Sequence, residues 1–394
     1  MKVELLAPAG DLERLKFAYR YGADAVYIGG KAFSLRARAS NFDLDAIHDA
    51  AQYANAHGKK LYVTTNIYPH PEDLDGIVEY LHALEASGVH AIIAAAPSIV
   101  TLARKHTQLE VHLSTQQSTL NRDAIRFWHD RGVERVVLAR ELDIEAIAAL
   151  VKNSPIELEA FIHGGMCMSY SGKCTLSNTM TDRDANRGGC AHSCRWFYTL
   201  KHDGRDLHKG VPFSMSSKDL SALSEIPALL KTGVASLKIE GRMKSVHYIA
   251  TVVNTYRRLI DAFYETPDSI DLAPYQAMLE HAENRETASG FLGGETGVEG
   301  QLYNMRSERV SQRFAALVES YDPKTREAIV SQRNYFTVGD TLEIFRPSGE
   351  AKRFVLDALT TIDHETIEVA RHPKQRLRMR VPVPVEKRDI IRKL

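Results

Sequence analysis

The stretch VELLAPAGDLERLKFAYRYGADAVYI, residues 3–28, predicts the fold of the first two thirds of this chain. It begins with a short apolar strand at Val3–Ala7. A helix follows, which Asp11 is expected to cap and Gly22 to end. A second apolar strand comes at Ala25–Ile28. A strand, a helix and another strand in this order are typical of a parallel βαβ unit.

The same alternation of apolar runs and helical patterns continues to about residue 264. The expected strands are Val3–Ala7, Ala25–Ile28, Lys60–Ile67, His90–Ala95, Leu109–Ser114, Arg135–Ala139, Ile156–Ile162 and Ala235–Ile239. Their uniformly apolar character predicts burial on both faces, as in a parallel sheet. Eight such strands favour a closed (β/α)8, TIM-like barrel. An open doubly wound sheet is the alternative, but no G-x-G-x-x-G follows the first strand.

A (β/α)8 barrel places functional side chains where its strands end. The expected catalytic residues on this map are His163, Arg140 and Glu240, and the expected ligand-binding residues are Arg36, Arg38, Asn66, Gln116 and Arg242. Guanidinium forks suit carboxylates, and imidazole titrates near neutral pH. The alternatives are salt bridges to acids such as Glu141 and a histidine that is merely packed.

All four cysteines lie between Glu159 and Trp196, at Cys167, Cys174, Cys190 and Cys194. Their spacing, C-x6-C-x15-C-x3-C, lies in the loop that leaves the seventh predicted strand. Four thiolates are the ligand set of an iron–sulfur cluster. Zinc normally uses closer cysteine pairs, disulfides need an oxidising compartment, and unliganded cysteines usually lie in apolar cores. These three alternatives remain open beside the cluster.

Aromatic residues flank the cysteines at Tyr170, Trp196, Phe197 and Tyr198. Such rings could stack on an unpaired base or simply fill a core. The sequence alone leaves both interpretations open.

The pattern changes after residue 265. Residues 266–305 are acidic and irregular, which predicts a linker or lid. Residues 306–394 predict a small antiparallel β-barrel with strands at 314–321, 327–332, 341–346, 353–359, 367–372 and 380–386. Its last part, residues 361–394, has nine Lys and Arg against five Asp and Glu. This surface could contact RNA phosphates, or it could be a solvated strand face.

Composition agrees with a globular protein. The 394 residues contain 50 Lys and Arg and 50 Asp and Glu, and no apolar run is long enough to span a membrane. The N-terminus lacks a leader pattern, which favours the cytoplasm. Neither H-E-x-x-H nor G-x-S-x-G is present to support a peptidase. A cysteine nucleophile beside His163 would leave three thiols unused.

The residues from Glu159 to Ser177, E-x-F-x2-G-G-M-C-x4-S-G-x-C-x-L-S, resemble the signature of the collagenase-like peptidases (peptidase unknown-type family 32). Further matching segments are LLAPAG (5–10), YIGGKAFSLRARASNF (27–42), HLSTQ (112–116), NRGGCAHSCRW (186–196), SSKDL (216–220) and LKIEGRMKS (237–245). The resemblance covers residues 1 to about 265 and is weaker beyond.

The resemblance implies an O2-independent hydroxylase rather than a peptidase. The most similar branch hydroxylates C5 of the tRNA wobble uridine with prephenate, while sister branches act on a 23S rRNA cytidine and on the ubiquinone ring. The family holds a 4Fe–4S cluster on four cysteines. The expected partners are therefore tRNA and a small dicarboxylate, with no membrane and with a homo- or hetero-oligomer left open. A collagenase-type peptidase and an iron–sulfur accessory subunit of an rRNA or quinone hydroxylase are the alternatives.

Overall fold

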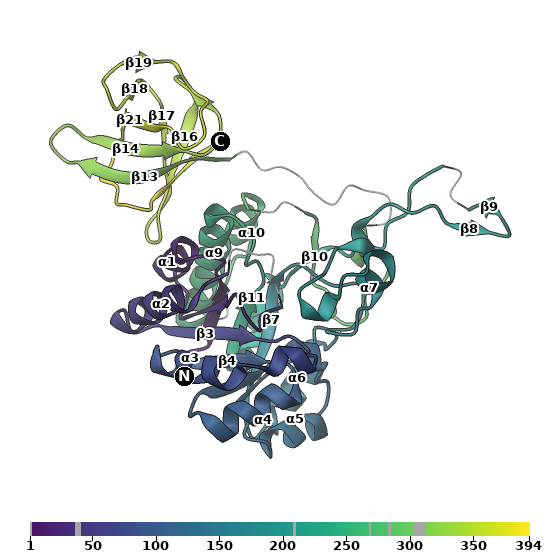
Figure 1. Cartoon of the computed structure of the whole chain (residues 1–394). Coiled ribbons are helices and arrows are strands. Elements are labelled where there is room, and N and C mark those ends of the chain that lie inside the picture. Colours follow the sequence, from purple (N-terminus) through teal and green to yellow (C-terminus); the bar gives the residue numbers. More distant parts are fainter. Residues whose placement is uncertain (1, 36–40, 208–209, 268, 283–284, 303–312) are drawn as a thin grey trace. The chain divides into compact units, whose positions relative to one another are not determined.

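The computed structural model describes residues 2–35, 41–207, 210–267, 269–282, 285–302 and 313–394 (Figure 1). The chain forms two compact units, Met1–Ala277 with Arg285–Glu308 and Met278–Asn284 with Arg309–Leu394. Among the helices in the described ranges, none is long and apolar enough to cross a membrane.

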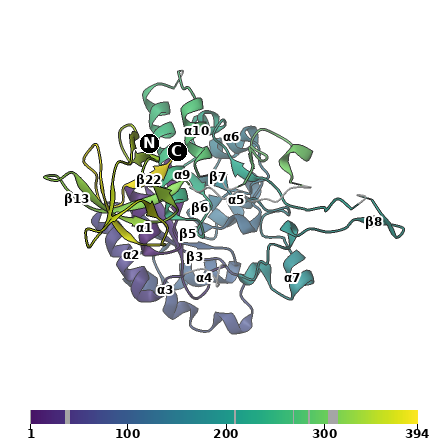
Figure 2. The same cartoon turned by 90° about the horizontal axis from the view of Figure 1, so that it is seen from above.

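The first unit is a closed barrel of eight parallel strands. The strands are β1 (Glu4–Pro8), β2 (Ala25–Gly29), β3 (Lys60–Thr65), β4 (Ala91–Ala94), β5 (Glu110–Leu113), β6 (Arg135–Val137), β7 (Glu157–Gly164) and β11 (Ser236–Ile239). Strands β1 to β7 pair in order, and β11 pairs with both β7 and β1. This closure confirms the predicted TIM-like barrel, and Figure 2 shows its strands ringed by helices.

Helices cover the outside of the barrel. They are α1 (Leu12–Arg20), α2 (Leu44–Ala56), α3 (Ile77–Ala86), α4 (Pro97–His106), α5 (Arg122–His129), α6 (Ile144–Lys152), α8 (Ile226–Thr232) and α9 (Val246–Glu265). The caps follow the sequence: the side chains of Asp11, Asp43 and Asp143 each accept a backbone N–H in the first helical turn.

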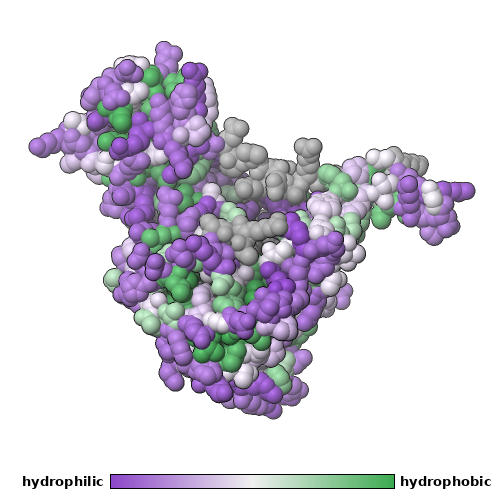
Figure 3. All heavy atoms as spheres, in the orientation of Figure 1, coloured by the Kyte–Doolittle hydropathy of each residue, from purple (hydrophilic) through white to green (hydrophobic). Residues whose placement is uncertain are grey.

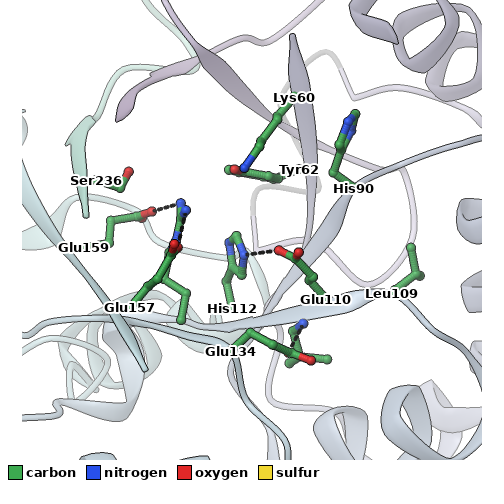
Figure 4. A network of polar contacts seen from close by, with 12 residues as sticks. Lys60, Tyr62, His90, Leu109, Glu110, His112, Glu134, Glu157, Glu159 and Ser236 are labelled. Atoms are coloured by element: carbon green, nitrogen blue, oxygen red, sulfur yellow. Dashed lines mark hydrogen bonds and ion pairs between the residues drawn. The ribbon is translucent and has the colours of Figure 1, made fainter. Parts of the chain in front are cut away.

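Charged residues fill the end of the barrel interior where the strands begin, which we call the barrel floor (Figure 4). Glu159 is fully buried and accepts hydrogen bonds from Lys238 Nζ at 2.7 Å and Arg135 Nη1 at 3.2 Å. Arg135 also donates to Glu4 at 2.5 Å and to Glu157 at 2.6 Å. Burial alone would raise the pKa of Glu159, but Lys238 and Arg135 outweigh it and lower the pKa to about 2.

An irregularity in β7 changes which way its last side chains face. The pairing with β11 runs Lys238 to Phe161 and then Ile239 to His163, so Ile162 is an extra residue. Before it, Glu159 and Phe161 face the barrel interior, where both meet Lys238. After it, His163 faces the outer helix α9.

The chain makes a long excursion between β7 and β11. It contains α7 (Leu176–Thr181), the single-turn helices η3 (Ala185–Arg187) and η4 (Ser193–Arg195), the hairpin β8 (Lys201–His202) and β9 (Arg205–Asp206), and β10 (Asp219–Ser221). The segment predicted as a linker or lid holds α10 (Ala273–Glu280) and β12 (Thr287–Ala288). Strand β12 pairs with β10, which runs antiparallel to β7, so part of this segment extends the barrel sheet.

The second unit is an antiparallel β domain. Its main sheet has the order β17-β16-β22-β13-β14-β21-β18-β19, and β15 pairs with β20. The strands are β13 (Phe314–Asp322), β14 (Glu327–Gln332), β15 (Phe336–Thr337), β16 (Thr341–Phe345), β17 (Lys352–Val355), β18 (Leu359–Thr361), β19 (Thr366–Ile367), β20 (Val369–Ala370), β21 (Arg376–Arg380) and β22 (Ile390–Lys393). Residues such as Val330, Phe336, Ile344 and Leu377 form its core.

The predicted strand at 380–386 is wrong. Pro382 and Pro384 lack the N–H that a central strand must donate. The pairing strands lie on either side, at β21 and β22. Some of the basic residues of this segment lie in these strands and have structural contacts. Arg376 contacts Glu319 at 2.7 Å, and Arg392 is fully buried.

Candidate active site at the barrel mouth

The cysteine loop, residues 163–200, lies on the barrel mouth, the rim where the strands end. At its start, Arg140 Nη1 donates to Gly165 O at 3.0 Å. Further along, the backbone N–H of Ser171 donates to Glu141 Oε1 at 3.0 Å. Near its other end, Arg187 Nη2 lies 2.7 Å from Asp73 Oδ1. The loop is therefore anchored to the segments that follow β3 and β6.

A close backbone contact ties the loop to the segment after β5. Gly172 has a φ of +74°, and a Cβ atom there would lie 2.3 Å from Gln116 O. Only glycine tolerates both the left-handed backbone and this approach. The glycine between Cys167 and Cys174 therefore lets the loop rest directly on Gln116.

The four thiols gather in this loop without forming disulfides. Burial raises the pKa of Cys194, and nearby Cys167, Cys174 and Cys190 raise it further, although Arg195 acts in the opposite direction. All three other thiols therefore lie within electrostatic range of Cys194. Across the described ranges, however, no three His, Cys, Asp or Glu side chains lie close enough together to form a metal site.

A chain of amides at the mouth has a fixed direction. The backbone N–H of Leu35 can only donate, and it donates to Asn66 Oδ1 at 3.2 Å. Asn66 Nδ2 must then donate to its neighbour, and it lies 2.7 Å from Gln116 Oε1. Ser114 Oγ donates to the same oxygen at 3.0 Å. The orientation of the Gln116 amide follows from these three contacts.

The amide chain ends in an unused donor. Gln116 is 6% exposed, and its Nε2 is buried with no hydrogen-bond partner among the described residues. A buried donor without a partner costs about 1–3 kcal/mol, so each such group asks for an explanation. An oxygen atom of a bound ligand would satisfy it.

Arg242 is 4% exposed and lies across the ends of β2 and β3. Its Nη1 donates to Ser34 Oγ at 3.2 Å and to Thr64 Oγ1 at 3.3 Å. A Cβ atom at Gly29 would overlap this guanidinium group, so glycine makes the room. Both of these partners, the side chains of Ser34 and Thr64, are neutral hydroxyl groups. The sequence analysis did not single out these two hydroxyls, because their role depends on contacts across strands.

Glu240 follows β11 and faces the phenol of Tyr27. The Tyr27 hydroxyl lies 3.0 Å from Glu240 Oε2 and 3.1 Å from Ile239 O, so its proton can serve one of them at a time. Lys238 Nζ lies 4.8 Å from the centre of the Tyr27 ring. Tyr27 therefore connects the charged floor to the carboxylate at the mouth.

Arg140 lies over the face of Phe161, with Cζ 3.9 Å from the ring centre. Its Nη1 holds the cysteine loop, as described above, while its Nε is buried and has no partner within the described ranges. The guanidinium group is thus fixed by a ring and a carbonyl. Neither of these two contacts involves a carboxylate.

The side chain of His163 points away from the barrel interior and towards α9. It is 2% exposed, and its Nδ1 is 3.1 Å from the Tyr256 hydroxyl on α9. Burial, with a smaller contribution from Lys244, lowers its pKa to about 3. The side chain is therefore a neutral group packed against α9, and a catalytic role for it stays a prediction. Arg36 and Arg38 lie outside the described residues.

Known proteins resemble the chain over both units. The model of peptidase family U32 matches residues 10–302, and that of the peptidase family U32 C-terminal domain matches residues 310–392. The tRNA hydroxylation protein P1 of Bacillus subtilis (strain 168) is 44% identical over 400 residues, covering 100% of this chain and 95% of the relative.

Two further relatives carry different names. The 23S rRNA 5-hydroxycytidine C2501 synthase of Escherichia coli (strain K12) is 38% identical over 264 residues, which are 67% of this chain and 40% of the relative. A protein of Porphyromonas gingivalis (strain ATCC BAA-308 / W83) named collagenase is 34% identical over 307 residues, or 74% of each chain.

Proposed function

The chain belongs to peptidase family U32, and on that premise we propose that it hydroxylates RNA, at C5 of the tRNA wobble uridine. The observation that carries this proposal is the full-length similarity to a protein named for tRNA hydroxylation. The relative named as an rRNA hydroxycytidine synthase supports the same chemistry on another pyrimidine. Both names describe hydroxylation of RNA, so the substrate class is more strongly supported than the base.

The proposed cofactor is a 4Fe–4S cluster on Cys167, Cys174, Cys190 and Cys194. The donor set supports it, because four thiolates are what such a cluster requires and these four belong to one loop. When bound, the cluster would supply one-electron transfer at the barrel mouth. The proposal requires the loop to bring the four thiols closer together, since those of the described residues do not form a metal site.

Prephenate, a dicarboxylate, is the proposed small ligand. Arg242 and Arg140 present guanidinium groups at the mouth, and Gln116 Nε2 offers a neutral donor at the same end of the barrel. Glu240, in contact with the Tyr27 hydroxyl, is the proposed general base at the mouth. The residues of the mouth thus divide into groups that bind anions and one that takes a proton.

Nucleoside mass spectrometry tests the reaction. tRNA from cells that lack the gene should contain no 5-hydroxyuridine derivatives, and the wild-type gene should restore them. Cys194→Ala should fail to restore them, whereas Ser193→Ala, a change at the adjacent residue, should succeed. Unchanged 5-hydroxyuridine in the deletion strain would reject this substrate.

Anaerobic purification tests the cofactor separately. We expect a brown protein with about four irons per chain, as one 4Fe–4S cluster requires. Cys194→Ala should lower the iron content, and Ser193→Ala should leave it unchanged. A colourless protein that contains zinc instead would reject the cluster.

Two other functions are tested by the same preparation. A peptidase, as the name of one relative suggests, would degrade gelatin. An accessory subunit would lack hydroxylase activity alone and would purify in a stable complex with another chain. Either result, together with unchanged tRNA, would replace the proposed function.

A further inference from the structure

Large apolar side chains beside the cysteines point into solvent. Tyr170 is 56% exposed, Phe197 is 47% exposed and Trp196 is 41% exposed. The sequence left open whether these rings belong to a core, and the structure excludes that interpretation. We call the three rings the aromatic surface. In Figure 3, green and pale residues lie among purple ones on the surface of the part that carries them. Exposed rings that lie together usually mark a site of interaction.

The aromatic surface flanks the cysteines in the sequence. Tyr170 lies between Cys167 and Cys174, while Trp196 and Phe197 directly follow Cys194 and Arg195. A Cβ atom at Gly165, two residues before Cys167, would lie 3.7 Å from Arg195 Nη2, so the two segments are neighbours. The three rings therefore belong to two neighbouring segments of the cysteine loop.

The backbone beneath the rings is held in place. The N–H of Trp196 donates to Ser193 O at 3.1 Å, and the Tyr198 hydroxyl donates to the same carbonyl at 2.7 Å. Tyr198 and Phe213 also exchange two backbone hydrogen bonds, at 2.7 and 2.9 Å. The exposed rings thus project from an ordered segment, which lowers the entropy lost when they bind a partner.

The charge of the segment favours an anionic partner. Residues 164–202 contain five Lys and Arg but only two Asp and Glu, a net charge of +3, whereas the whole chain is neutral. Lys173 and Arg195 lie in sequence beside the three rings. An apolar protein interface would instead be depleted of charge at its centre. Flat rings among cations suit a partner with phosphates and exposed bases.

We propose that Tyr170, Trp196 and Phe197 stack on unpaired bases of a single RNA strand, while Lys173 and Arg195 contact its phosphates. Bases within a duplex already stack on one another, so only an unpaired strand can offer their faces. This assignment rests on the proposed RNA substrate. It brings an unpaired base beside the cysteine loop, at the mouth where the reaction is proposed.

Fluorescence anisotropy with the full chain measures this binding directly. The probes are a fluorescein-labelled single-stranded RNA of about 12 nucleotides and a duplex of the same sequence. The wild type should prefer the single strand. Trp196→Ala, Phe197→Ala and Tyr170→Ala should each weaken binding by about fivefold or more, since each removes one stacking platform.

The matched control is Phe127→Ala. Phe127 lies on α5, outside the cysteine loop, and is 46% exposed, nearly the same as Phe197. Its replacement should change the affinity by less than about twofold, as expected for a side chain outside the binding surface. Phe197→Leu keeps the hydrophobicity but removes the ring, so it should weaken binding as alanine does.

Salt dependence separates stacking from charge. In a plot of log affinity against log salt concentration, the aromatic variants should keep the wild-type slope. Arg195→Ala should make the slope shallower by about 0.7, because one phosphate contact is lost from a single strand. A slope that changes with the aromatic variants instead would overturn the assignment.

Other results would also overturn it. Equal affinity of the wild type and all three aromatic variants would remove the stacking role, as would equal affinity for single strand and duplex. If Trp196→Ala instead dissolves a dimer seen by gel filtration without changing RNA affinity, the surface binds a second copy. Trp196→Phe covers the case in which the alanine variant fails to fold, and it should retain binding.

The binding test is independent of the proposed reaction. Ring-dependent RNA binding without hydroxylated tRNA in cells would retain the aromatic surface and reject the chemistry. Hydroxylation that persists in Trp196→Ala and Phe197→Ala, with unchanged RNA affinity, would retain the chemistry and reject the surface.

Discussion

The two ends of the barrel interior differ in whether their buried polar groups have partners. At the floor, the fully buried Glu159 has two cationic partners, Lys238 and Arg135. At the mouth, the almost equally buried Gln116 keeps a donor that no described residue uses. Paired groups hold strands together, whereas an unpaired one lowers stability and is available to a ligand. The comparison indicates that the floor serves the fold and the mouth serves binding, as expected for a TIM-like barrel.

The largest effect is expected at the floor. Glu159→Gln should lower the free energy of unfolding by about 3–5 kcal/mol, because Lys238 and Arg135 would remain as buried cations without their central carboxylate. Urea unfolding at pH 7 measures the change. Since the pKa of Glu159 is lowered to about 2, its contribution should persist down to about pH 4 and disappear as the pH falls further towards 2.

Glu157→Gln is the matched control at the floor. Glu157 contacts the same guanidinium group of Arg135 at 2.6 Å, but its side chain is 54% exposed. Water screens such a pair, so the expected loss is below about 1 kcal/mol. Equal losses for the two variants would mean that burial does not distinguish the floor.

The second largest effect is expected at the mouth, on activity. Gln116→Leu removes the unused donor but leaves both Asn66 Nδ2 and Ser114 Oγ without their acceptor, so the free energy of unfolding should fall by about 1–3 kcal/mol. Ligand binding should weaken about tenfold or more, because the ligand oxygen loses its donor. Unfolding in urea and the dissociation constant for prephenate are the two measurements.

Gln117, the adjacent residue, is the control because its side-chain donor already has partners. Its Nε2 already donates to Ala95 O at 2.6 Å and to the Tyr68 hydroxyl at 3.3 Å. Gln117→Leu should therefore lower stability by about 1 kcal/mol with little change in ligand binding. If Gln117→Leu weakens the ligand as much as Gln116→Leu does, the unused donor is not what binds it.

Sequence patterns predicted the strands and helices of the barrel and the end at which the cysteine loop lies. Apolar strands, capped helices and the position of the cysteine loop after the seventh strand all follow from local residues. The loop reaches the mouth because it leaves the carboxyl end of β7, a consequence of barrel topology. The amide chain was harder to foresee, since Asn66 and Gln116 are fifty positions apart and only the closed barrel brings them together.

The direction of His163 could not be predicted from alternation along β7. Counting by two from Glu159 and Phe161 places it inside the barrel. The extra residue at Ile162 reverses the direction, and it depends on the register between β7 and β11. Pairing between strands that are distant in sequence is not encoded in either strand alone.

The third largest effect is expected from His163, a buried group outside the barrel interior, on the pH dependence of stability. Because the pKa of His163 is lowered to about 3, the unfolded chain binds a proton below about pH 6.5 while the folded chain stays neutral. This residue should therefore reduce stability by about 1 kcal/mol for each unit that the pH falls from 6.5 towards 3.

His163→Phe should remove that dependence. Urea unfolding of both proteins at pH 7 and pH 5 gives the comparison, and the variant should lose less stability over this interval. Parallel losses in the two proteins would mean that His163 can take up a proton in the folded state, as its predicted catalytic role requires.

The smallest effect concerns the ion pair that anchors the cysteine loop. Arg187 and Asp73 are 2.7 Å apart with side chains 30% and 22% exposed, and the hydrogen bond from Arg187 lowers the pKa of Asp73. Exposed pairs contribute about 0.2–1 kcal/mol, so Arg187→Ala should barely change global unfolding. Locally, hydrogen exchange should accelerate at the Tyr68 amide, which donates to Asn186 O at 3.2 Å.

Arg122→Ala is the control, since Arg122 pairs with Asp123 on an exposed helix with side chains 62% and 78% exposed. It should affect neither measurement. If exchange at Tyr68 stays slow in Arg187→Ala, the close packing of Gly172 on Gln116 and the contacts of Arg140 and Glu141 hold the loop without this pair. The mouth would then differ from the floor in a second respect, because its architecture would depend on backbone contacts rather than on paired charges.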